Sequence, residues 1–163
     1  MTRVQVAEKI EQDLKPLLLT LGQTARQAAR TLALASTKTK NMALNAMADQ
    51  IRKNSSRILL ANSEDIAKAK ANGLTPSFID RLTLSAASVE GIAKGVEKIA
   101  ELPDPVHVVL KEWTRPNGLH ISRISVPIGV IGIIYESRPN VTADAGALCL
   151  KSGNASLLRT GSD

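Results

Sequence analysis

The stretch Ile128-Gly-Val-Ile-Gly-Ile-Ile-Tyr135 contains no charged residue and is apolar at almost every position. An uninterrupted apolar run of this length indicates a parallel strand that helices cover on both faces. Residues 141–152 can form a helix that ends at Gly153-Asn154, and Ala155–Leu158 form a second short apolar run. Together these segments predict a βαβ unit and therefore an α/β fold.

Upstream of this unit, apolar residues recur at helical spacing through about the first hundred residues. The region Val6–Leu21 is predicted to be a helix that Pro16 kinks or divides, and Ala25–Leu32 form a further helical stripe. Further helices are predicted from their caps: one after Ser36-Thr37, one over Ser56–Ala71, a short one at Thr75-Pro76 and a longer one opened by Ser85. These stripes indicate helix packing and carry no chemistry of their own.

Two prolines, Pro103 and Pro105, end the helical pattern. The strand-like runs Val106–Trp113 and Leu119–Val126 flank Arg115-Pro-Asn-Gly118 and predict a hairpin, in which Asn-Gly supplies the positive φ angles of the turn. His107 and His120 fall on these strands without an acidic or cysteine partner nearby in the sequence, so we expect surface histidines. The chain thus divides into helices over residues 1–102, a hairpin over 103–126 and the start of a parallel sheet over 127–163.

The net charge of +6 and the pI near 9.7 could indicate a nucleic-acid partner. Three aromatic residues cannot build a base-stacking platform, which argues against that partner. The single cysteine cannot form an internal disulfide, and no Cys or His residues have the spacing of metal ligands. No apolar run is long enough to cross a bilayer. We therefore expect a cytosolic protein that binds no structural metal and does not span a membrane. The basic residues of the first half alternate with acids and are expected on solvated helix faces: Arg26, Arg30, Lys38, Lys40, Arg52, Lys53 and Arg57.

Ligands of open α/β sheets bind beyond the carboxyl ends of the strands. Two loops lie at that edge of the predicted sheet, Glu136–Asn140 and Arg159–Asp163. Arg138 and Arg159 are therefore candidates for contact with a phosphate or a carboxylate, although an exposed arginine at a strand end is also commonly structural. The sequence contains neither a G-x-G-x-x-G fingerprint nor a Walker lysine motif.

Two further residues invite chemical interpretations. Asn140 could cap the helix that follows it or donate a hydrogen bond to an oxygen that becomes negative in a transition state, and the residues alone favour the cap. Cys149 is the only thiol, but its neighbours are apolar and no histidine is placed to deprotonate it. We therefore expect Cys149 to be a packing residue.

The segment Val126-Pro-Ile-Gly-Val-Ile-Gly-Ile-Ile-Tyr-Glu-Ser-Arg-Pro-Asn-Val-Thr142, continued by Ala147–Ala155 and Leu158-Arg159, closely resembles the gamma-glutamyl phosphate reductases. These enzymes, also called glutamate-5-semialdehyde dehydrogenases, belong to the aldehyde dehydrogenase superfamily. The similarity extends upstream to about Gln23, and the string from Tyr135 to Thr142 is highly specific for the family.

The resemblance implies a helical segment, a β-hairpin of the oligomerisation type and the first βαβ unit of an aldehyde-dehydrogenase-like Rossmann domain. It implies NADPH-dependent reduction of L-glutamyl 5-phosphate to L-glutamate 5-semialdehyde and phosphate in proline biosynthesis. A homo-oligomer and glutamate 5-kinase are the implied protein partners.

By position, the resemblance also assigns residues. Asn140 matches the family asparagine that stabilises the oxyanion, and Arg159 lies near the adenosine ribose and its 2′-phosphate. Tyr135, Glu136, Ser137 and Arg138 would line the cofactor and substrate crevice. The nucleophilic cysteine of the family lies downstream of every residue present, so we expect this chain to be catalytically incomplete.

Other interpretations remain open. The family usually has glycines and a lysine after the position of Arg159, whereas this chain has Thr160, Ser162 and Asp163. This difference leaves open whether the enzyme prefers NADP or NAD as its cofactor. The chain could also be the reductase half of a bifunctional pyrroline-carboxylate synthase, which the start at Met1 disfavours. A stand-alone helical or nucleotide-binding module without catalysis is the alternative from a different class.

Overall fold

The computed structural model describes residues 3–136 and 138–161, with side chains from Leu14 onward. The described residues form a mixed α/β fold with six helices and four strands, as predicted. The helices are α1 (Arg3–Ala33), α2 (Thr37–Lys53), α3 (Ser55–Ala71), α4 (Pro76–Leu82), α5 (Ala86–Glu101) and α6 (Pro139–Lys151). The strands are β1 (Val109–Thr114), β2 (His120–Ile124), β3 (Val130–Ile134) and β4 (Ala155–Arg159).

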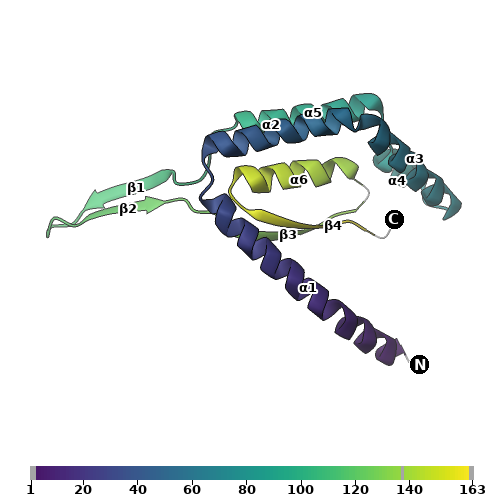
Figure 1. Cartoon of the computed structure of the whole chain (residues 1–163), viewed down its shortest axis with the longest axis horizontal. Coiled ribbons are helices and arrows are strands. Elements are labelled where there is room, and N and C mark those ends of the chain that lie inside the picture. The colour runs from purple at the N-terminus through teal and green to yellow at the C-terminus, as the bar shows by residue number, and fades with distance from the viewer. Residues whose placement is uncertain (1–2, 137, 162–163) are drawn as a thin grey trace.

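The helices and the parallel strands form layers (Figure 1). Helices α2 and α5 lie side by side and pack on α6, which in turn packs on β4. The core between these helices contains Leu44 and Ala48 of α2, Ala93 and Val96 of α5, and Ala147 of α6, all fully buried. Helix α6 is therefore held between α2 and α5 on one side and β4 on the other. This packing places the first turn of α6 at the ends of the strands.

Strands β3 and β4 pair in parallel, with α6 as the crossover, which confirms the predicted βαβ unit. The side chain of Asn154 sets the start of this pairing, because its Oδ1 accepts a hydrogen bond of 2.8 Å from the Gly129 N–H. The Ala155 N–H donates to the Gly129 carbonyl at 2.9 Å. Helices cover β3 only in part within the described residues: α1 and α6 contact mainly β4, and Ile134 is 74% exposed.

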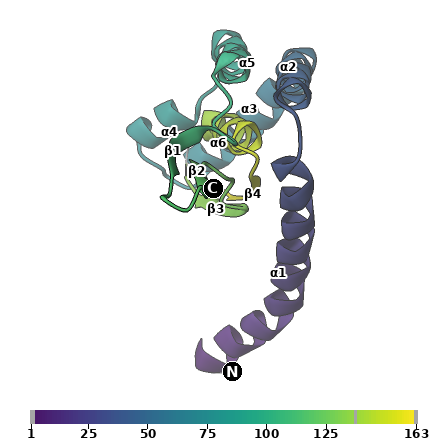
Figure 2. The ribbon, with the colours of Figure 1, turned by 90° about the vertical axis from the view of Figure 1, so that its left-hand side faces the viewer.

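Helix α1 runs without a break through Pro16, and its amino-terminal part curves away from the line of the rest (Figure 2). The expected division at Pro16 was therefore wrong, whereas the curvature agrees with the other expectation, a bend of this helix. Proline removes one backbone donor, but this residue lies on an exposed side of the helix, and the Thr20 hydroxyl donates to the Pro16 carbonyl at 3.0 Å. The flanking leucines and alanines are good helix formers, so one missing bond does not end the helix.

The cap signals of the sequence are confirmed. Ser36 caps α2 by accepting a hydrogen bond of 3.1 Å from the Thr39 N–H, and Thr75 caps α4. Ser85 forms a capping box with Ser88 at the start of α5. These bonds satisfy N–H groups that have no partner within the helix, which is why the boundaries could be predicted closely.

The hairpin formed by β1 and β2 projects away from the layered helices (Figure 1). Its turn differs from the prediction, because Gly118 has a φ of 82° whereas Asn117 does not adopt a positive φ. Instead, the Asn117 side chain accepts a hydrogen bond of 3.2 Å from the Leu119 N–H. The turn therefore uses glycine for conformation and asparagine for hydrogen bonding.

The two histidines are exposed, as predicted, but their settings differ from the prediction. His107 lies before β1 and has a φ of 62°, unusual for a residue with a side chain. His120 does have an acidic neighbour, since pairing of the strands brings its Nε2 within 3.8 Å of Glu112 Oε1. Sequence distance concealed this contact because the partner lies on the opposite strand.

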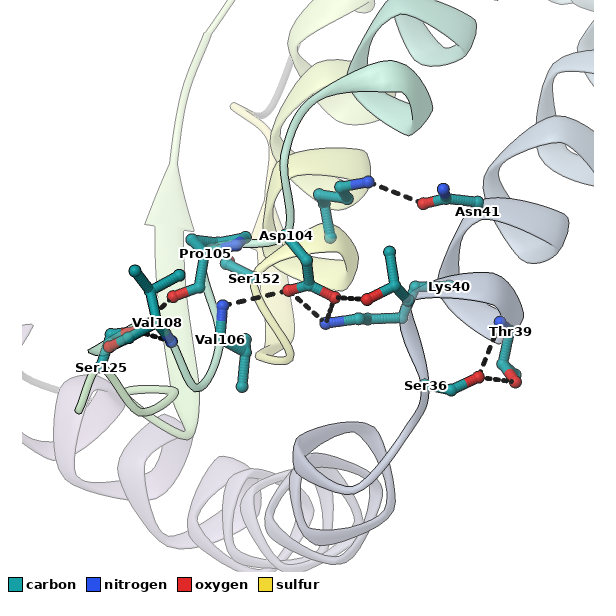
Figure 3. Close-up of polar contacts among 12 residues, drawn as sticks. Ser36, Thr39, Lys40, Asn41, Asp104, Pro105, Val106, Val108, Ser125 and Ser152 are labelled. Atoms are coloured by element: carbon teal, nitrogen blue, oxygen red, sulfur yellow. Dashed lines mark hydrogen bonds and ion pairs between the residues drawn. The ribbon is translucent and has the colours of Figure 1, made fainter. Parts of the chain in front are cut away.

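Lys40 is only 2% exposed, so the expectation that it lies on a solvated helix face was wrong. Its Nζ lies 2.6 Å from an oxygen of Asp104, which also accepts hydrogen bonds from the Thr37 hydroxyl at 2.7 Å and the Val106 N–H at 3.0 Å (Figure 3). Burial opposes ionisation of Asp104, but these bonds outweigh it and lower the pKa of the carboxyl. The cluster ties the start of α2 to the link between α5 and the hairpin.

Arg52 also departs from the expected solvated face. Its Nε lies 2.9 Å from Glu90 Oε2, and its Nη2 lies 2.9 Å from Glu97 Oε2. Hydrogen bonds from Arg52 lower the pKa of both glutamates, while the same bonds raise the pKa of the guanidinium. This fork of one arginine and two carboxylates joins α2 to α5 beside their apolar contact.

Asp104→Asn should lower the free energy of unfolding by about 3 kcal/mol at pH 7, because Lys40 would keep a buried charge without its counter-ion. The pKa of Asp104 is below its ordinary value of 3.8, so its contribution is present above that pH and is lost as the pH falls through the folded-state pKa. Urea unfolding at pH 7 and at acidic pH measures both effects. Asp80→Asn on the exposed face of α4 is the matched control; equal stabilities of the parent and Asp104→Asn at pH 7 would contradict the prediction.

Gly153→Ala should be destabilising by about 2 kcal/mol or more, because φ is 73° there and a Cβ would lie 2.9 Å from Pro127 Cγ. Gly91→Ala in α5 is the control, since a Cβ there meets nothing within 4 Å and alanine favours the helix. Urea unfolding of both variants is the measurement. An equal change in the two would show that the turn at Gly153 does not require glycine.

Candidate functional site

The carboxyl ends of β3 and β4 lie together at one edge. The final pair of the register is Ile134 with Arg159, and the Tyr135 N–H donates to the Arg159 carbonyl at 3.1 Å. The loop that leaves β3 and the residues that leave β4 therefore start from adjacent points. The first turn of α6 lies at the same edge, because α6 begins only a few residues after β3 ends.

A pocket of about 230 Å³ opens at this edge. Its walls come from both loops, from the first turns of α6 and from two helices far away in the sequence. The lining residues are Asp65 of α3, Leu82 of α4, Tyr135, Arg138, Pro139, Thr142, Thr160 and Gly161. Acidic, basic and hydroxyl groups thus face one small space, as in sites that bind a polar ligand.

Tyr135 and Arg138 are the predicted site residues that line the pocket. The Tyr135 hydroxyl is hydrogen-bonded to the Thr142 hydroxyl, which fixes the aromatic ring against α6. Arg138 is exposed and occupies the N-cap position of α6. Because it lines the pocket, its guanidinium can pair with an anion there.

The structure corrects the capping interpretation of Asn140. Helix α6 begins at Pro139, so Asn140 lies inside its first turn and the N-cap is Arg138. The Asn140 side chain points along the helix instead, and its Nδ2 donates to Asp144 Oδ2 at 3.1 Å. An amide carries two N–H donors, and this bond uses one of them.

The other predicted residues that the structure describes do not line this pocket. Asn140, Arg159 and Glu136 are all exposed. Arg159 stands on the rim, where β4 ends. Ser137 lies outside the described residues.

Cys149 is buried in α6, with 5% of its surface exposed. Burial raises the pKa of its thiol, so the reactive thiolate is disfavoured. This setting agrees with the interpretation of Cys149 as a packing residue.

Sequence reasoning missed several residues at this edge. Thr142 and Asp144 could have been noticed from helical spacing, since Asp144 lies one turn after Asn140 on the same face. Asp65 and Leu82 gave no local signal, because tertiary packing alone brings α3 and α4 to the pocket. The charges that face the site are therefore more balanced than two arginines suggested.

A larger cavity of about 680 Å³ lies between α1, His107 and the segment 126–130. It lies at the amino end of β3, and apart from Arg26, Arg30 and His107 its walls are apolar or glycine. Ligands of parallel sheets bind at the opposite, carboxyl end, so we assign the functional site to the smaller pocket. Within the described residues, no helix combines the length and apolarity that crossing a bilayer would require.

Comparisons with known proteins show the family of the chain. No family model matches the chain. The gamma-glutamyl phosphate reductase of Parvibaculum lavamentivorans is 60% identical over 152 residues, which are 93% of this chain and 36% of that protein. That of Paramagnetospirillum magneticum is 60% identical over 151 residues, with the same two coverages.

Solved structures give the same result. The gamma-glutamyl phosphate reductase of Thermotoga maritima matches with a TM-score of 0.86 and 44% identity, over 88% of this chain and 35% of that one. The enzyme of Saccharomyces cerevisiae matches with a TM-score of 0.84 and 35% identity, over 88% and 36%. The chain spans 36% of the length of the curated relatives named above. In sequence and in fold, this chain belongs to the gamma-glutamyl phosphate reductase family and corresponds to the amino-terminal portion of its members.

Proposed function

We propose that this chain forms the amino-terminal part of a cytosolic enzyme of proline biosynthesis that reduces L-glutamyl 5-phosphate with NADPH. The products are L-glutamate 5-semialdehyde, phosphate and NADP⁺, and one proton is consumed. The observation that carries the proposal is the 60% identity with the Parvibaculum lavamentivorans reductase over 93% of this chain. The polar pocket at the carboxyl edge of the sheet supports it independently.

In the proposed reaction, a cysteine thiolate from the rest of the enzyme attacks C5 of the acyl phosphate and phosphate leaves. When bound, NADPH would supply the hydride for the resulting thioester carbon, and collapse of the intermediate would release the aldehyde and regenerate the thiolate. Cys149 does not take the part of the nucleophile, because it is buried and its pKa is raised. The described residues contribute orientation and charge to this reaction.

Asn140 is proposed to stabilise the oxyanion. Each tetrahedral stage places a negative charge on the oxygen at C5, and an amide N–H aimed at that oxygen stabilises it without reorganisation. The bond to Asp144 supports this role, because it fixes which end of the amide is the donor end. One such donor is typically worth about a hundredfold or more in kcat.

The cofactor is proposed to lie across the rim formed by the two loops. Arg159 carries an exposed, permanently charged guanidinium at the end of β4, which suits the 2′-phosphate of NADPH. Tyr135, Glu136 and Arg138 precede α6 and are proposed to line the cofactor, as is Ser137 by its place in the sequence. Arg138 suits a phosphate or carboxylate. This donor set fits a phosphorylated dinucleotide.

Association is part of the proposal. The hairpin exposes Val109, Leu110 and Trp113 on its first strand, an apolar surface that contact with another copy would cover. We therefore propose that the complete enzyme is a homo-oligomer joined through this hairpin. Glutamate 5-kinase is a further proposed partner, because direct transfer would protect the acyl phosphate from water.

The function is tested in a complete polypeptide made by joining residues 1–163 to the remaining carboxyl-terminal part of the Parvibaculum lavamentivorans reductase, here called the joined reductase. It should oxidise L-glutamate 5-semialdehyde with NADP⁺ only when phosphate is present, which is the reverse of the proposed reaction. Arg159→Ala should lower kcat/KM for NADP⁺ roughly 10- to 100-fold, because a charge-assisted contact is lost, and should change kcat/KM for NAD⁺ far less.

Arg57→Ala, at an exposed arginine of α3, is the control and should leave both values unchanged. Equal losses with NADP⁺ and NAD⁺ in Arg159→Ala would defeat the 2′-phosphate role. A joined reductase without phosphate-dependent activity would defeat the proposed function itself.

The 163-residue chain alone should show no turnover of L-glutamyl 5-phosphate with NADPH, because its only cysteine is buried in α6. Absorbance of NADPH is the measurement, with the joined reductase as the positive control. Turnover that disappears in Cys149→Ser would contradict the prediction and return Cys149 to the list of candidate nucleophiles.

A further inference from the structure

Asp144 is a carboxylate that the reaction outlined above does not use. It is half-buried on α6, one turn after Asn140, and its Oδ2 accepts the hydrogen bond from Asn140 Nδ2 at 3.1 Å. Within the described residues, no Lys, Arg or His nitrogen lies within 4.0 Å of this carboxylate. A negative charge without a cation therefore stands beside the proposed oxyanion donor.

Helix α5 contributes a glycine beside Asp144. A Cβ built at Gly95 would lie 3.6 Å from Asp144 Oδ1, which is an ordinary van der Waals distance. Because Gly95 has no side chain, this residue of α5 does not cover the Oδ1 atom of the carboxylate. Glycine is a poor residue for a helix interior, so its presence here costs helix stability.

An uncompensated carboxylate is unfavourable at this position for catalysis. The C5 oxygen becomes negative in the transition state, and a second negative charge close to it would raise the barrier in a partly buried site. The carboxylate becomes compatible with the reaction when a cation is seated on it. The proposed substrate carries such a cation in its own α-ammonium group.

We infer that Asp144 is the group that binds the α-ammonium of the amino-acid substrate, so that substrate binding itself neutralises the charge next to Asn140. This inference rests on the proposed function and adds to it the basis of specificity for an α-amino acid derivative. Asp144 is then a substrate-binding residue, and the Asn140–Asp144 pair contacts both ends of one short molecule.

The dimensions of the substrate agree with this assignment. Asn140 Nδ2 and Asp144 Oδ2 lie 3.1 Å apart. Carbon–carbon and carbon–nitrogen single bonds are about 1.5 Å long, so the chain from C5 to the ammonium nitrogen spans roughly 5 Å when extended. Because a hydrogen bond adds about 3 Å at each end, a substrate beside this pair can place its C5 oxygen at Asn140 and its ammonium at Asp144.

The test compares two aldehydes in the joined reductase: L-glutamate 5-semialdehyde and the analogue without the amino group, 5-oxopentanoate. Asp144→Asn removes the charge and keeps the size and an oxygen acceptor for Asn140. It should lower kcat/KM for the amino aldehyde roughly 10- to 100-fold and leave kcat/KM for 5-oxopentanoate unchanged or higher. Asp80→Asn, on the exposed face of α4, should change neither value.

Equal losses of kcat/KM with both aldehydes would show that Asp144 only supports Asn140 or the fold. An unchanged kcat/KM for the amino aldehyde would show that Asp144 does not bind the ammonium. Either result overturns the inference. If Asp144→Asn lowers the melting temperature of the joined reductase, Asp144→Ser is compared on the same two substrates and judged by the same two outcomes. A parent inactive with both aldehydes would overturn the proposed function, and the inference with it. An active parent with equal losses overturns the inference alone.

Discussion

The parallel pairing of β3 with β4 determines where the two loops and the first turn of α6 meet. A parallel pair needs a crossover, and α6 supplies it, so the carboxyl ends of both strands and the first turn of α6 must meet at one edge. Asn154 starts the register through its bond to the Gly129 N–H, and the last pair joins Ile134 to Arg159. A slip of one residue would turn Leu157 away from α1 and break the apolar contact with Ala25 and Ala29.

Polar contacts hold the helices in the positions that this edge requires. Lys151, at the end of α6, is 2% exposed and donates to Asn41 Oδ1 at 2.7 Å and to the Ala100 carbonyl at 2.8 Å. It therefore joins α6 to both α2 and α5, close to the pair of Lys40 with Asp104. Buried lysines are tolerated only when paired or fully hydrogen-bonded, so these contacts specify one arrangement of the three helices.

Local signals predicted the elements well, because caps and turns act within a few residues. Ser85 and Thr75 satisfy nearby N–H groups, and their sequence spacing shows it. Long-range contacts were invisible: the partner of Lys40 lies 64 residues away, and Asp65 reaches the pocket only through packing of α3. Asn140 was misjudged from local pattern alone because Pro139 starts α6 earlier than a capping asparagine would allow.

We propose one short substrate along the first turns of α6, in contact with both Asn140 and Asp144. A crystal structure of the joined reductase with L-glutamate 5-semialdehyde and NADP⁺ decides this placement. The aldehyde oxygen should lie within hydrogen-bond distance of Asn140 Nδ2, and the ammonium group should lie on the Asp144 carboxylate. A substrate bound away from α6, for example in the cavity between α1 and residues 126–130, would contradict it.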